Sequence, residues 1–155
     1  MKKLLGLVLL VIMFVSGCGT PKGSATTIDF SNLTPSQVVE TYYKSIASSD
    51  YSTAKACLAD DISQQYISAP DSYFKNIKQL TDLKVSTPAP IKLYGKNFDE
   101  VQVTADFVAE YKKVITSNSG KQTRFIYVGK KEKDSPWKII SIGTVYRSPL
   151  SRHDF

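Results

Sequence analysis

Alternating apolar and polar residues predict a long β-strand in the second half of the chain. Over residues 101–112 every second side chain is apolar: Val101, Val103, Ala105, Phe107, Ala109 and Tyr111. A period of two is typical of a strand with one buried face. The turn sequence Ser117-Asn118-Ser119-Gly120 then predicts a hairpin whose return strand covers 121–130.

A third strand is expected over 137–146, after a turn at Asp134-Ser135-Pro136. Strict alternation divides its side chains between two faces, with Ile139, Ser141, Gly143 and Val145 on one and Ile140, Ile142 and Thr144 on the other. Apolar groups on both faces of one strand need cover. A homodimer through the sheet is therefore one expected arrangement.

The first half of the chain has helical spacing instead. Thr34-Pro35-Ser36-Gln37 supplies an N-cap threonine, a proline at the first helical position and a glutamine that can reach back to the cap. The apolar residues that follow recur at helical intervals: Val38, Val39, Tyr42, Tyr43 and Ile46. We expect a first helix over 35–48 with one apolar face.

Two shorter helices are expected next. Asp50 can cap a second helix, which we expect Asp60-Asp61 to close. A third helix is expected from Pro70 or Asp71 to about residue 80, on the helical spacing of Tyr73, Phe74, Ile77 and Leu80.

The segment 81–100 is expected to form an edge strand with a break. Pro88 and Pro90 exclude a regular central strand there, because proline cannot donate to the ladder. A turn is expected at Gly95-Lys96-Asn97.

Helices followed by long antiparallel strands predict an α+β fold, with the N-terminal helices packed on one face of a strongly bent antiparallel sheet. The chain resembles the nuclear transport factor 2-like, or cystatin-like cone, superfamily over residues 34–147. The resemblance is carried by Val39, Tyr42 and Tyr43, by Leu58-Ala59-Asp60 and by Trp137-Lys138-Ile139-Ile140. Within that superfamily it is similar to small bacterial lipoproteins of uncharacterised function. The resemblance implies a cone-shaped domain whose open end is commonly a pocket, and it specifies fold rather than chemistry.

The N-terminus pairs a basic start, Lys2-Lys3, with an apolar run from Leu4 to Val15 and the sequence Val15-Ser16-Gly17-Cys18. Twelve residues make a helix of about 18 Å, too short for a hydrocarbon core of ~30 Å. The segment resembles a bacterial lipoprotein signal peptide, which implies cleavage before Cys18 and diacylglycerol on its thiol. The alternative is an ordinary secretory signal that leaves Cys18 as a reactive thiol.

These features predict four segments: a signal peptide over 1–17, a lipidated tether over 18–33, the domain over 34–147 and a tail over 148–155. The expected location is the extracytoplasmic face of the cell membrane, with the lipid on Cys18 as the anchor. Lipidation would leave Cys57 without a disulfide partner, and we expect it to be a small buried residue.

Candidate chemistry is sparse. The ketosteroid isomerase pattern within the resembled superfamily suggests a pocket with Tyr42 or Tyr43 facing Asp60 or Asp61, and Trp137 is a further candidate pocket residue. The one histidine, His153, lies in the tail, which disfavours histidine-dependent catalysis and a zinc site, so neither metal nor cofactor is expected. We therefore expect a non-catalytic binding or interaction module, with a small-ligand isomerase- or hydratase-like enzyme as the alternative.

Charge adds a second candidate surface. The chain has a formal charge of +6, and basic residues concentrate in the predicted hairpin: Lys112, Lys113, Lys121, Arg124, Lys130, Lys131 and Lys133. They are candidates for contact with anionic lipid or a cell-wall polymer, whereas the alternative is that they only protect strand edges from pairing. Nucleic acid is not an expected partner, because aromatic residues are not interleaved with the lysines as a stacking surface requires.

Overall fold

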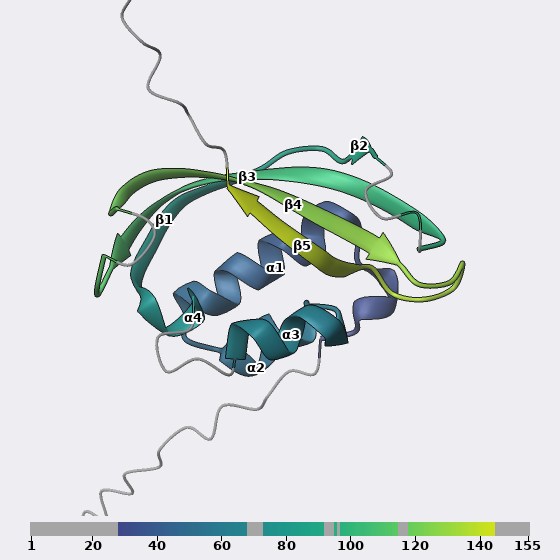
Figure 1. Ribbon diagram of the computed structural model, residues 1–155, viewed down its shortest axis with the longest axis horizontal. Helices are drawn as coiled ribbons and strands as arrows, with labels where there is room; N and C mark the ends of the chain where they lie inside the picture. The colour runs from purple at the N-terminus through teal and green to yellow at the C-terminus, as the bar shows by residue number, and fades with distance from the viewer. Residues whose placement is uncertain (1–27, 68–72, 92–94, 96, 115–117, 145–155) are drawn as a thin grey trace, which may run out of the picture.

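The computed structural model describes residues 28–67, 73–91, 95, 97–114 and 118–144. The expected signal peptide, Cys18 and the tail lie outside these residues. The fold is α+β, as predicted, with a five-stranded antiparallel sheet that does not close into a barrel. In Figure 1 the helices all lie on one side of a curved sheet, and we call this its core-facing side.

The helical part begins with a short turn, η1 (Phe30–Asn32), followed by four helices. These are α1 (Pro35–Ala47), α2 (Tyr51–Ala56), α3 (Asp60–Ile67) and α4 (Tyr73–Asn76). The sheet contains β1 (Ile77–Val85), β2 (Ala89–Pro90), β3 (Asp99–Tyr111), β4 (Gly120–Lys130) and β5 (Lys138–Thr144).

The order of the long strands is β1-β3-β4-β5, and β2 continues the β1 edge by pairing with β3 at Gln102 and Val101. The predicted long hairpin is confirmed, because β3 and β4 pair without interruption from Asp99↔Lys130 to Ala109↔Gly120. The broken edge strand is confirmed as well. Ser86 lies in the break, where its hydroxyl accepts from the backbone N–H of Thr104 at 2.9 Å and its carbonyl accepts from the Ser36 hydroxyl at 2.8 Å.

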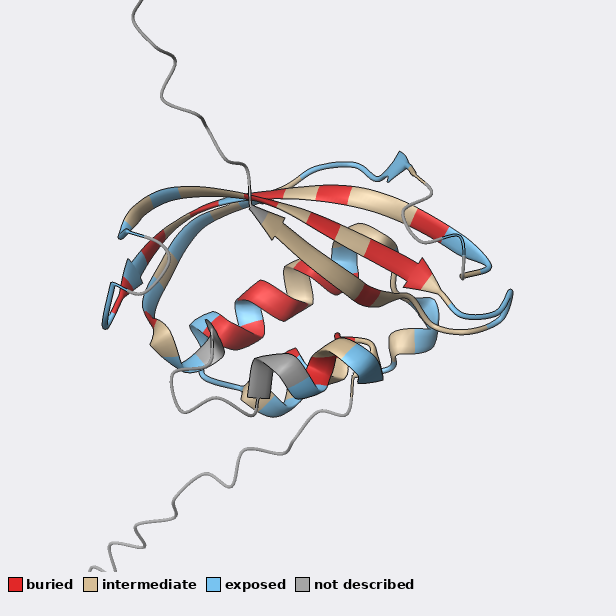
Figure 2. Cartoon of the chain, in the orientation of Figure 1, coloured by how far each residue is buried: buried red, intermediate tan, exposed pale blue. Residues whose placement is uncertain are grey.

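Helix α1 begins as the sequence predicts. The Thr34 hydroxyl accepts a hydrogen bond from the Gln37 backbone N–H, and the Gln37 side chain accepts one from the Thr34 N–H at 2.8 Å. This capping box satisfies two N–H groups that a helix start leaves without partners. The helix buries one face in the core: Val38, Val39, Tyr42, Tyr43, Ser45 and Ile46. Figure 2 shows this buried stripe facing the buried middle of the strands.

Two boundaries differ from the sequence prediction. Asp60 and Asp61 do not close the second helix; they form the first turn of α3. The expected third helix is only the single turn α4, and Ile77 and Leu80 belong to strand β1. Leu80 stands opposite Ala109 and Ile77 opposite Tyr111, so pairing with β3 prevails over the helical spacing.

The alternation expected in the third strand is wrong beyond Ile139. A bulge opposite Tyr127 and Val128 shifts the register, so that Ile139 pairs with Val128 and Ile142 with Ile126. Ile139 is fully buried and Ile142 packs against the same core. The extra residue of a bulge exchanges the two faces of a strand, and therefore both isoleucines point inward.

The folded part begins earlier than the expected boundary at residue 34. Phe30 and Leu33 pack against the core, and Asp29 caps η1 by accepting from the Ser31 N–H.

Candidate functional site

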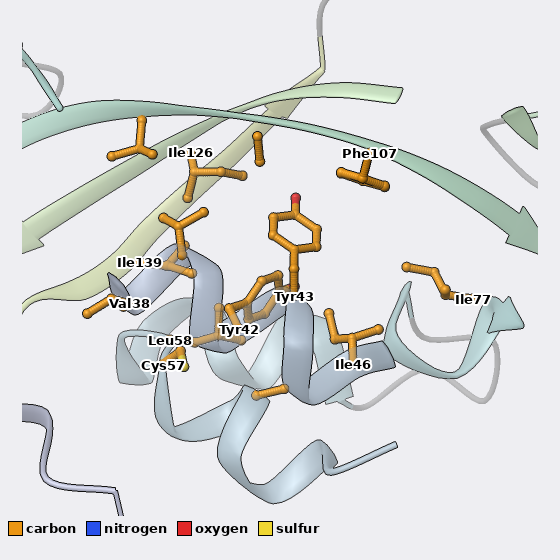
Figure 3. Close-up of a cluster of buried hydrophobic side chains, with 14 of the residues drawn as sticks. Val38, Tyr42, Tyr43, Ile46, Cys57, Leu58, Ile77, Phe107, Ile126 and Ile139 are labelled. Atoms are coloured by element: carbon orange, nitrogen blue, oxygen red, sulfur yellow. The ribbon is translucent and has the colours of Figure 1, made fainter. Parts of the chain in front are cut away.

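The two tyrosines predicted to line a pocket lie inside the core. Tyr42 and Tyr43 are both 0% exposed. Their rings meet edge to face with 5.0 Å between centroids, and the ring of Tyr43 packs on Phe107 with 4.7 Å between centroids. Figure 3 shows Tyr43 pointing from α1 towards the sheet. These rings occupy the space between α1 and the sheet.

Asp60 and Asp61 are exposed and line a surface pocket of about 650 Å³ that neither tyrosine reaches. The start of α3, the end of β4 and the start of β5 form its walls. Backbone hydrogen bonds fix this arrangement, because Ile139 donates to the Cys57 carbonyl and accepts from the Ala59 N–H, both at 2.9 Å. The structure therefore separates the predicted tyrosines from the predicted carboxylates.

The apolar side of the pocket is formed by Leu58, Gly129 and Ile140. A Cβ atom on Gly129 would lie 3.2 Å from Cδ1 of Ile140 and 3.3 Å from Cγ of Asn97. A larger residue at position 129 would force these neighbours outward. A glycine inside a strand often marks such a close approach, and Gly129 within the predicted return strand is the signal by which the sequence could have indicated this part of the site.

Charges of both signs surround this apolar side. Asp60 and Asp61 lie on the α3 wall, and Lys131 and Lys138 on the strand wall. Lys138 is held in place because its ammonium donates to the carbonyl of Ala56 and lies 4.4 Å from the centre of the Phe30 ring. Lys131 is exposed. The pocket lining thus contains two carboxylates, from α3, and two ammonium-bearing side chains, from the segment between β4 and β5 and the start of β5.

Trp137, the remaining predicted pocket residue, is half-buried against the core between two residues that line the pocket, Pro136 and Lys138. The ammonium of Lys130 lies 5.2 Å from the centre of its ring. Trp137 itself does not line the pocket, contrary to the prediction, but both of its sequence neighbours do, so its fluorescence can be used to follow binding there.

The basic residues of the hairpin do not form one face. Lys112, Lys113 and Lys121 lie at the end of the sheet where β3 stops and β4 starts. Lys130 is the last residue of β4 at the other end, and Lys131 and Lys133 follow it. Lys130 comes nine positions after Lys121 along the strand, which corresponds to a distance of about 30 Å. A ligand surface that uses both groups would have to span most of the molecule.

Arg124 is wrongly predicted as a surface contact. It is 5% exposed and stands opposite the fully buried Ala105, so it points to the core-facing side. Its guanidinium donates to the Gln122 side chain at 2.9 Å and to the Thr123 carbonyl at 3.1 Å. Arg124 is part of the buried structure.

Cys57 is buried, as expected, at the end of α2. Burial raises the pKa of its thiol to about 12, opposed by the nearby charge of Lys138 and reinforced by that of Asp50. Such a thiol stays protonated at neutral pH and is a poor nucleophile. Among the described residues, no three His, Cys, Asp or Glu side chains lie close enough together to hold a metal ion.

None of the helices in the described part of the chain is long and apolar enough to cross a bilayer. Comparison with curated proteins gives no match, and comparison with solved structures gives none either. One family model matches residues 36–143, from the first turn of α1 to β5, and it bears the description "Domain of unknown function (DUF4829)". The match covers well over half of the chain and every wall of the pocket, and the chain therefore belongs to this family.

Proposed function

We propose that this protein is a lipid-anchored lipoprotein of the extracytoplasmic membrane face, and that its domain is a non-catalytic binding module. The domain would be a nuclear transport factor 2-like cone. A single layer of helices on one side of a curved antiparallel sheet supports this assignment (Figure 1).

One observation carries the binding function: the charged pocket lies at the edge of the fold, and large side chains fill the space between helix α1 and the sheet. A catalytic cone requires a substrate cavity there, with an acid or base facing it. Tyr42, Tyr43 and Phe107 occupy that space, and Asp60 and Asp61 line the outer pocket instead. The alternative of a small-ligand enzyme that uses a tyrosine and an aspartate inside the cone is therefore not supported by the positions of these residues.

The ligand class follows from the pocket walls. An ammonium group would be attracted to Asp60 and Asp61, and a carboxylate to Lys131, over an apolar strip that includes Ile140. We propose a small zwitterionic ligand, such as a free amino acid or a short peptide. Its attraction to both walls is strengthened where the apolar side excludes water.

Binding is tested by titrating the chain with a set of free amino acids, dipeptides and tripeptides, followed by Trp137 fluorescence. The same peptides with an acetylated amino end or an amidated carboxyl end are the chemical controls. We expect saturable binding of at least one zwitterion and at least tenfold weaker binding of both blocked forms.

Two variants complete that test. Asp60→Asn and Lys131→Gln should each weaken binding, whereas Lys133→Gln, an exposed neighbour outside the pocket lining, should not. Equal binding of free and blocked peptides, or the absence of binding across the set, would contradict the proposed ligand class.

The anchor is tested in a bacterium that makes lipoproteins, by metabolic labelling with a fatty acid. We expect label and membrane fractionation with the full chain, and loss of both in Cys18→Ala. Cys57→Ala is the matched control, because it removes the other cysteine and should keep the label. Label that persists in Cys18→Ala would overturn the assignment of the anchor.

A further inference from the structure

Five lysines gather at the end of the molecule where β1 starts, β3 stops and β4 starts. They come from four separate segments: Lys75, Lys78, Lys112, Lys113 and Lys121. Glu110, which forms an ion pair with Lys78 at 2.6 Å, is the one acidic residue in the described segments 75–78, 110–114 and 118–121. We call this group, with a net formal charge of +4, the basic end.

Asn76 fixes the geometry of the basic end. Its side-chain amide donates to the Lys113 carbonyl at 2.9 Å, and its side-chain oxygen accepts from the Lys113 N–H at 3.0 Å. Its backbone carbonyl accepts from the Lys112 N–H at 2.8 Å. The corner between α4 and β1 is thereby joined to the end of β3, so Lys75, Lys112 and Lys113 share one rigid surface.

Val114 adds an apolar group to this surface. It follows the two lysines directly and is 71% exposed, one of two large apolar residues with such exposure among the described part of the chain. A solvated apolar side chain flanked by lysines is typical of surfaces that meet the interface of a bilayer.

The opposite end of the sheet has the opposite charge. Among the residues that the structure describes there, Lys130, Lys131, Lys133 and Lys138 are accompanied by six carboxylates, on Asp60, Asp61, Asp99, Glu100, Glu132 and Asp134, so these residues together carry a net formal charge of −2. The charge of the domain is therefore polarised along the sheet, and an anionic surface attracts only the basic end.

We propose that the basic end docks on anionic phospholipid headgroups, with Val114 in the bilayer interface. The inference rests on the proposed membrane location. It also sets an orientation, because η1, which follows the proposed anchor segment, lies at the end of the domain opposite α4 (Figure 1). Anchored near one end and docked at the other, the domain lies lengthwise along the membrane.

The test uses the mature chain from residue 18 with Cys18→Ser, which retains every described residue but has no lipid. Cosedimentation is measured with vesicles of phosphatidylcholine alone and of phosphatidylcholine mixed with phosphatidylglycerol. We expect binding to the mixed vesicles only, with an affinity that falls at least tenfold between 50 and 200 mM salt. This range includes the concentrations at which the screening length is about 8–10 Å, so the electrostatic attraction between lysines and headgroups weakens across it.

Two double variants with the same charge change locate the surface. Lys112→Glu with Lys113→Glu should weaken binding at least tenfold, whereas Lys131→Glu with Lys133→Glu should change it less than twofold. Val114→Ser should weaken binding severalfold without any change in charge. Thermal melts followed by circular dichroism are the control that each variant is folded.

Three outcomes would overturn the proposal: equal binding to both kinds of vesicle, no binding to either, and equal losses in the two double variants. Binding to a soluble poly(glycerol phosphate) polymer without binding to the mixed vesicles would assign the surface to a cell-wall polymer instead. None of these results depends on the peptide titration or on the labelling of Cys18, so this proposal and the proposed function fail separately.

Discussion

At the scale of single residues, two glycines in neighbouring strands differ in the space around them. A Cβ atom added at Gly129 would have atoms of Ile140 and Asn97 within 3.3 Å, whereas the nearest atom to one added at Gly143 is the Phe125 carbonyl oxygen at 3.6 Å. The first spacing is tighter than an ordinary contact, and the second is not. The positions of the pocket residues Ile140 and Asn97 therefore depend on the absence of a side chain at Gly129.

We expect Gly129→Ala to destabilise the domain by about 1 kcal/mol and to displace Asn97 or Ile140, because the added methyl overpacks the site. Gly143→Ala is the matched control and should change the free energy of unfolding by less than half as much. Urea denaturation of both variants gives the comparison, and equal effects would show that the close approach at Gly129 is absent.

Cys57 should make stability depend on alkaline pH. Its pKa is about 12 in the folded chain against an ordinary value of 9.0, so the folded state retains a proton that the unfolded state releases. The stabilising contribution is complete below pH 9 and is lost as the pH rises towards 12.

The measurement is the free energy of unfolding from pH 8 to pH 11 for the parent chain and for Cys57→Ala. Lysines and tyrosines also titrate in this range, so the difference between the two curves isolates the thiol. We expect the parent to lose more stability than the variant over this interval. Parallel curves would show that the Cys57 thiol titrates normally.

Arg124 shows what residue-level prediction could and could not supply. Its position in the strand, two residues before Ile126 and four before Val128, gives it the same parity as these two core residues. Parity therefore indicates the core-facing side, but its charge indicates the surface. The hydrogen bond that its guanidinium donates to Gln122 offsets part of the cost of burial, and it depends on the side chains that surround the strand in the fold.

At the scale of elements, the start of α1 can be tested by itself. Thr34→Ala removes the acceptor for the Gln37 N–H, and we expect a loss of about 1 kcal/mol in the free energy of unfolding. Thr34→Ser keeps a hydroxyl at the same position and should restore most of it. A thermal or urea melt of the three chains is sufficient, and an unchanged Thr34→Ala would contradict the role of the cap.

The elements predicted correctly are those whose signals are local. The capping box determines where α1 begins, and the period of two sustained over residues 101–112 identifies most of β3 (Asp99–Tyr111). The errors fall where a local pattern is ambiguous. Ile77 and Leu80 are three residues apart, which suits a helix, and only their pairing with Tyr111 and Ala109 places them in a strand.

At the scale of the whole molecule, the candidate surfaces are determined by distances between charged residues that cannot be read from the sequence. Eight basic residues between 110 and 138 look like one cluster, yet the length of β4 separates seven of them into groups at opposite ends of the sheet, and Arg124 is buried between the two groups. The carboxylates that neutralise one of these ends come partly from α3, about seventy residues away in the chain. The fold class could be predicted from the sequence, but the separation of positive and negative charge between the two ends of the sheet could be recognised only in the folded structure.

A homodimer through the outer side of the sheet remains a prediction at this scale. Phe125 and Tyr127 point to that side, because their neighbour Ile126 is buried in the core, and both are half-buried. We expect sedimentation equilibrium of the unlipidated chain to give twice the chain mass. Phe125→Glu with Tyr127→Glu should give the monomer mass, and a parent that is monomeric at all concentrations would exclude the dimer.

The parallel bridge between Leu58 and Ile139 has a consequence for the proposed membrane-anchored state. Strand β5 is the last strand of the sheet, and an unpaired strand edge is a template for aggregation. The segment around Leu58 uses both outward backbone groups of Ile139, so a second molecule cannot pair with this part of the edge. The proposed lipid anchor would confine molecules to two dimensions and raise their encounter rate, and the bridge would then protect them from edge-to-edge polymerisation.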